Sequence, residues 1–173
     1  MGEARGRTET RPMNALVLYE SKFGNTERLA EAIALVLQES IPTRLAAVSD
    51  IDDCAEALQG ISLLVVGGPT HRHGVSTMLR ETLACLEDHA LEGIKVAIFD
   101  TRLHGPRVLT GSAGVGLERF LRKHGAWIVV PPMSFLVGAT EGPLDPGELE
   151  HARAWTIDVL RAIGVRPHER AAV

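Results

Sequence analysis

Short apolar runs alternate with amphipathic stretches along most of the chain. The runs are four to six residues long, which is the length of a buried strand, and the stretches between them carry apolar residues every three or four positions, as on one face of a helix. The pattern predicts strands at 14–19, 43–48, 61–66, 94–99 and 127–130. It predicts helices at 26–39, 52–58, 76–89 and 112–124, and a last helix that starts near 145–148 and ends near 163.

This alternation predicts an α/β fold, because parallel strands need helical crossovers between them. We expect one doubly wound, five-stranded parallel sheet with helices on both faces, in a single domain over 13–165. Residues 1–12 are interpreted as a disordered leader and 166–173 as a tail. Gly67, Gly68 and Pro69 are expected to stop the third strand. Both tryptophans, Trp127 and Trp155, are expected in the core.

Composition narrows the functional classes. Hydrophobic residues make up 45% of the 173 residues but aromatic residues only 4%, so the core is expected to be mainly aliphatic. The net charge of −4 gives no indication of nucleic-acid binding. No apolar run reaches the roughly 18 residues of a membrane-spanning helix. Two cysteines are too few for a disulfide framework and lack zinc-ligand spacing. A cytoplasmic protein is expected, and no feature of the sequence predicts an oligomeric state.

The loops that follow the strands are the expected ligand sites, because doubly wound sheets bind ligands at the carboxyl ends of their strands. The loop at 20–26 has the chemistry of an anion site: Ser21 and Thr26 carry hydroxyl groups, Asn25 carries an amide, and Gly24 allows a tight turn onto a helix N-terminus. Lys22 adds positive charge. The alternative interpretation is a helix cap at Asn25 or Thr26.

Two further loops, 67–75 and 100–112, are expected to face the same ligand. The candidate contacts in them are Pro69, Thr70, His71, Arg72, His73, Gly74, Thr101, Arg102 and His104. The alternatives are an exposed basic turn before a helix capped at Ser76, and pairing of Asp100 and Arg102 with neighbours that only orders the third loop. Two histidines two positions apart, without a third ligand, do not predict a metal site.

A family resemblance rests on two of these loops. The segment Ser21-Lys22-Phe23-Gly24-Asn25-Thr26 resembles the flavodoxin phosphate loop, Ser/Thr-x-Thr/Phe-Gly-Asn-Thr. Gly67-Gly68-Pro69-Thr70 is similar to the second flavin loop of that family. The resemblance implies a flavodoxin-like fold of the short-chain type, strand order 2-1-3-4-5, and a non-covalent FMN whose phosphate is held by residues 21–26.

One departure from the family pattern affects the expected function. Flavodoxins often hold the flavin between aromatic rings, whereas the second and third loops here lack aromatic residues apart from Phe99 at a strand end. The resemblance implies a redox protein that carries electrons between protein partners, or a small flavin reductase with a small-molecule electron acceptor. The alternative is an interaction module of the same fold with weak or lost FMN binding. The basic residues of these loops are expected to favour the reduced, anionic flavin.

Overall fold

The sheet of the computed structural model has the predicted strand order. The structure describes residues 13–70, 77–84, 86–105 and 113–167, and within them six strands form one parallel sheet in the order β2-β1-β3-β4-β5, with β6 also beside β4. The strands are β1 (Ala15–Tyr19), β2 (Thr43–Ala47), β3 (Leu63–Pro69), β4 (Lys95–Leu103), β5 (Trp127–Ile128) and β6 (Met133–Val137).

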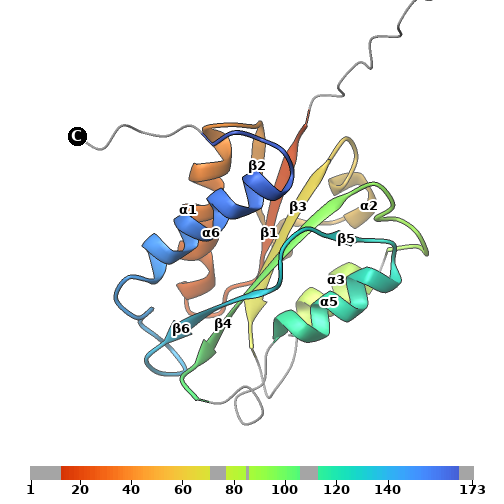
Figure 1. Ribbon diagram of the computed structural model, residues 1–173. Helices are drawn as coiled ribbons and strands as arrows, with labels where there is room; N and C mark the ends of the chain where they lie inside the picture. The colour runs from red at the N-terminus through yellow and green to blue at the C-terminus, as the bar shows by residue number, and fades with distance from the viewer. Residues whose placement is uncertain (1–12, 71–76, 85, 106–112, 168–173) are drawn as a thin grey trace, which may run out of the picture.

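Helices cover both faces of the sheet. They are α1 (Asn25–Gln38), α2 (Cys54–Ala57), α3 (Thr77–Ala84), α5 (Ala113–Lys123) and α6 (Glu148–Ala162), and a 3-10 turn, η1 (Val48–Asp50), follows β2. Figure 1 shows α1 and α6 on one face and α2, α3 and α5 on the other. The predicted α/β class is confirmed. Among the described residues, no helix is both long and apolar enough to cross a membrane.

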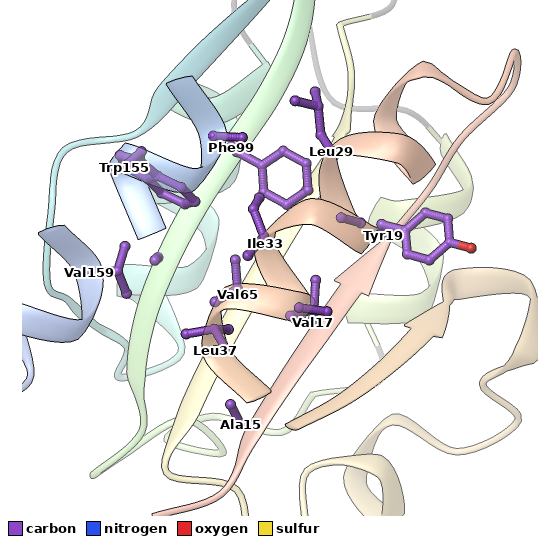
Figure 2. Packing of buried hydrophobic residues seen from close by; sticks show 14 of the residues in the cluster. Ala15, Val17, Tyr19, Leu29, Ile33, Leu37, Val65, Phe99, Trp155 and Val159 are labelled. Carbon is purple, nitrogen blue, oxygen red and sulfur yellow. The ribbon is translucent and has the colours of Figure 1, made fainter. Parts of the chain in front are cut away.

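The core lies in two layers, because successive side chains of a strand point to opposite faces of the sheet. Val17, Val65 and Phe99 belong to the buried cluster under α1 and α6. The residues that follow or precede them in the strands, such as Leu18 and Val66, belong to the cluster under the other helices. Figure 2 shows the first cluster, with the hydroxyl end of Tyr19 pointing away from it.

The few aromatic side chains are distributed unevenly between core and surface. Phe99, Phe135 and Trp155 pack edge to face, with ring centroids 6.2 to 6.3 Å apart. The prediction of a buried Trp127 is wrong, since this residue is 64% exposed on the two-residue edge strand β5. The ammonium group of Lys95 lies 6.0 Å from the centre of its ring.

The glycine pair does not end the third strand as predicted. β3 continues through Gly67 and Gly68 to Pro69, which pairs with Thr101 of β4. The reason is packing: Gly67 pairs with Phe99, and a Cβ added at Gly67 would lie 2.2 Å from Cζ of that ring. A buried aromatic ring therefore occupies the space of the missing side chain. β4 likewise extends to Leu103, so the start of the predicted third loop is strand.

The fifth strand position is divided between β5 and β6. β5 pairs with Lys95 and Val96 at the start of β4, whereas β6 pairs with its last five residues, 99–103. The four residues between β5 and β6 include Pro131 and Pro132, which have no backbone N–H to donate to a ladder. The sequence prediction ended the strand at residue 130 and missed β6, although the order of the sheet is unaffected.

Candidate functional site

The first loop leads into α1 without a side-chain cap. Gly24 is the N-cap residue, in the left-handed conformation with φ of 80°, and no side chain caps the helix. The predicted alternative of a cap by Asn25 or Thr26 is therefore wrong. Glycine is suited to this position because it adopts positive φ without steric cost. The first N–H groups of α1 thus lie at the carboxyl edge of the sheet without a side-chain acceptor, an arrangement that favours anions.

Ser21 supplies a polar group in the same place. Its hydroxyl oxygen is buried and has no hydrogen-bond partner in the structure. Buried hydroxyl groups are normally satisfied, because an unpaired one costs about 1–3 kcal/mol. A ligand oxygen at this position would satisfy it.

The side chains of Asn25 and Thr26 bind protein groups. Thr26 is 2% exposed, and its hydroxyl lies 3.2 Å from the hydroxyl of Thr101, which joins α1 to β4. The amide nitrogen of Asn25 donates to the backbone oxygen of Glu141, 3.0 Å away in the connection between β6 and α6. The first loop is thereby fixed against two other parts of the carboxyl edge.

The ends of β3 and β4 are fixed to each other and to α5. The N–H of Thr70 donates to the backbone oxygen of Thr101 at 2.9 Å, and its hydroxyl donates to the carboxylate of Asp100 at 3.3 Å. Asp100 is fully buried and also accepts from the N–H of Gly114 at 2.8 Å, while the hydroxyl of Thr70 accepts from the N–H of Ala113 at 3.0 Å. A carboxylate at a helix N-terminus is electrostatically favourable.

Arg102 and His104 make contacts that order the third loop. The guanidinium of Arg102 donates to the backbone oxygens of Leu103 at 3.3 Å and Gly105 at 2.9 Å. The ring of His104 forms a close contact through Nε2 with the carboxylate of Asp145. These contacts agree with the ordering interpretation, although Arg102 also lines the pocket described next.

These loops border an open pocket with an empty volume of about 470 Å³, a figure that includes the open solvent at its mouth. Its lining residues are Ser21, Lys22, Phe23, Asn25, Thr26, Pro69, Thr70, Thr101, Arg102, Leu103, Val137 and Thr140. Most of the predicted contacts are therefore brought together. Gly24 and His104 lie nearby but are not among the lining residues, and the predicted contacts His71, Arg72, His73 and Gly74 lie outside the described residues.

Three lining residues were missed by sequence reasoning: Leu103, Val137 and Thr140. Leu103 lies within the third expected loop but was not among its candidate contacts. The other two follow from β6, whose pairing with the carboxyl half of β4 brings its own end to the same edge. Recognition of a strand after the two prolines would have placed the connection at 138–147 among the expected ligand loops.

The charged groups around the pocket favour an anion. Lys22 and Arg102 line it, and the described lining residues include no aspartate or glutamate.

At the end of β1, burial raises the pKa of Tyr19 to about 12, helped by a 3.0 Å hydrogen bond from its hydroxyl to Glu27. No group of three potential metal ligands occurs among the described residues.

A comparison with family models decides the identification. Residues 17–109, more than half of the chain, match the family described as Flavodoxin. The chain belongs to the flavodoxin family. Members of this family bind FMN, so the cofactor predicted from the sequence is confirmed at the level of the family. A comparison with curated proteins finds no match.

Solved structures show the same fold for this flavodoxin. Oxidised flavodoxin 1 from Bacillus cereus is 20% identical, with a TM-score of 0.72 over 86% of this chain and 97% of that one. Flavodoxin 2 from Bacillus cereus is 22% identical, with a TM-score of 0.70 over 86% and 98%. Rubredoxin oxygen:oxidoreductase from Desulfovibrio gigas is 17% identical, with a TM-score of 0.70 over 90% of this chain but 37% of the larger protein.

Proposed function

We propose that this flavodoxin binds FMN in the pocket at the carboxyl edge and carries electrons between redox partner proteins in the cytoplasm. The observation that carries the proposal is the buried hydroxyl of Ser21, which has no partner and lies beside the uncapped start of α1. When bound, FMN supplies the redox chemistry, and the chain supplies binding, orientation and electrostatics.

The first loop fits a phosphate monoester. The hydroxyl of Ser21, the N–H groups at the start of α1 and the ammonium of Lys22 are donors, and Ser21, Lys22 and the first residues of α1 line the pocket. Gly24 allows the backbone to turn so that the N–H groups face the anion. Thr26 contributes its backbone N–H, and its hydroxyl also has a proton to donate when the hydroxyl of Thr101 is the donor between the two.

The flavin ring is proposed to lie against the ends of β3 and β4. Pro69, Thr70 and Thr101 are held there by the bonds to Asp100 and α5, so their backbone groups have fixed positions. Arg102 also lines the pocket and adds positive charge there. The predicted contacts His71, Arg72, His73, Gly74 and His104 remain part of the proposal.

A carrier is favoured over a reductase by the apolar groups at the site. Phe23 and Leu103 line the pocket yet are 40% and 41% exposed, and exposed apolar side chains around a site suit transient contact with another protein. The interaction-module alternative is supported by one observation: Phe23 is the only aromatic side chain among the described lining residues.

Binding is tested by adding FMN to the purified protein, removing the excess, and recording flavin absorption and fluorescence. The Ser21→Ala variant should bind FMN about tenfold more weakly, the value of one charge-assisted hydrogen bond, without loss of apoprotein melting temperature. Ser40→Ala is the matched control, because the Ser40 hydroxyl is also buried without a partner. Absence of flavin binding by the wild type, even at micromolar FMN, would favour the interaction module.

The rate of steady-state turnover distinguishes an electron carrier from a reductase. The FMN-loaded protein should pass electrons to cytochrome c after chemical reduction, and it should oxidise NADH or NADPH slowly. Rapid steady-state oxidation of either nucleotide with a quinone acceptor would identify a reductase instead.

A further inference from the structure

The connection between β6 and α6 forms a compact turn at the edge of the pocket. An antiparallel bridge joins Val137 to Leu144, and the N–H of Gly142 donates to the backbone oxygen of Ala139 at 3.0 Å. These contacts close the segment 137–144, called here the 137–144 turn.

The turn is fixed to the start of α1 through Asn25. The side-chain amide of Asn25 donates to the backbone oxygen of Glu141 at 3.0 Å. Gly142 has φ of 104°, and a Cβ added to it would lie 2.5 Å from Nδ2 and 2.6 Å from Oδ1 of Asn25. Only glycine allows this approach, so the backbone of the turn lies directly against the first residue of α1.

Thr140, the residue before Glu141, lines the pocket together with Ser21, Lys22 and Asn25. We infer that Thr140 is a further ligand of the FMN phosphate, and that Asn25 is a positioning residue that holds the turn against the phosphate loop. The inference rests on the proposed function. We place the hydroxyl of Thr140 at the phosphate end of the pocket because the next residue, Glu141, is bound to Asn25 at the start of α1. A residue near the flavin ring would instead lie beside β3 or β4.

The chemistry is that of a neutral donor added to an anion site. The hydroxyl of Thr140 donates to a phosphate oxygen, as proposed for the hydroxyl of Ser21. The two residues line the same pocket although they are more than a hundred positions apart in the sequence. A site closed in this way distinguishes FMN from riboflavin, which has the same ring and polyol but no phosphate.

Thr140→Val tests the ligand role, because it removes the hydroxyl and keeps the shape. The control is Thr82→Val on α3, away from the pocket lining. Dissociation constants for FMN and riboflavin are measured with the apoprotein. Thr140→Val should weaken FMN about tenfold and leave riboflavin unchanged, whereas Thr82→Val should change neither. Equal weakening of both flavins, or no change, overturns the inference.

Asn25→Ala and Gly142→Ala test the positioning role. Both should reduce the preference for FMN over riboflavin, and adding Thr140→Val to Asn25→Ala should then cost less than it does alone. Additive losses would show that Asn25 does not act through the turn. As a second readout, inorganic phosphate added to the apoprotein should shift the amide resonance of Thr140, and an unchanged resonance counts against the ligand role. A wild type that binds no FMN refutes the proposed function as well, whereas binding that Thr140→Val leaves intact refutes this inference alone.

Discussion

Replacement of Gly67 with alanine tests how the end of β3 is built. The added methyl group would lie 2.2, 2.3 and 2.5 Å from three ring carbons of Phe99. That ring has no exposed surface and packs against Phe135 and Trp155 at centroid distances of 6.3 and 6.2 Å, so it has little space into which to move. Overpacking of cores costs about 1–3 kcal/mol, and a buried ring should place the loss near the upper value.

Gly68→Ala is the matched control, one residue later on the opposite face. Its methyl group would lie 3.1 Å from Cδ2 of Leu79 and 4.0 Å from Cβ of Glu20, and the end of a leucine side chain can move. The expected loss is below about 1 kcal/mol, within the range of mild substitutions. For a chain of this size, about 3 kcal/mol corresponds to about 6–12 °C of melting temperature.

The assay is thermal and urea unfolding of the apoprotein, followed by far-ultraviolet circular dichroism. Phe99→Leu removes the ring atoms that crowd Gly67, so Gly67→Ala should cost less in that background, with a coupling energy of about 1 kcal/mol or more. Equal losses for the two glycine variants, or additive effects of Gly67→Ala and Phe99→Leu, would refute the packing explanation.

Two other groups at the carboxyl edge give further predictions. Tyr19 is the only tyrosine, so the tyrosinate absorption band should titrate near pH 12 in the folded protein, and Glu27→Gln should lower that midpoint. Because the raised pKa favours the neutral phenol, its contribution to stability is present below pH 10 and is lost as the pH rises toward 12, which urea unfolding across this range would show. Asp100→Ala should cost about 2–3 kcal/mol in urea unfolding, because it leaves donors of Thr70 and Gly114 unpaired in the interior. Asp100→Asn keeps an acceptor and should cost less, and an equal loss would count against this hydrogen-bond explanation.

Sequence periodicity was sufficient for the fold class but not for the ends of strands. The runs of aliphatic residues identified β1, β3 and β4, because a strand buried on both faces contains little else. The edge strand β2 was also predicted, although its residues are only partly buried or exposed. Gly67 and Pro69 were interpreted as stop signals from local preference, whereas the packing of Phe99 and the pairing with β4 keep them in the strand. β6 was missed because Pro131 and Pro132 were interpreted as the end of the last strand, and no strand was expected after them.

For the site, the sequence identified residues but not their partners. The phosphate loop was recognised because it is continuous, from Ser21 to Thr26. The bond of Asn25 to Glu141 spans 116 positions, and no local pattern indicates it. The buried position of Asp100 at the start of α5 is likewise a long-range contact, so the carboxylate was assigned to an open loop.

The divided fifth strand also affects how the molecule resists aggregation. An open sheet edge with consecutive N–H and carbonyl groups invites strands from other chains. Here β5 has only two residues, and Pro131 and Pro132 follow before β6 begins, so the row of donors along this edge is interrupted. The same break that obscured β6 in the sequence thus makes this edge a poor template for strand addition by another copy.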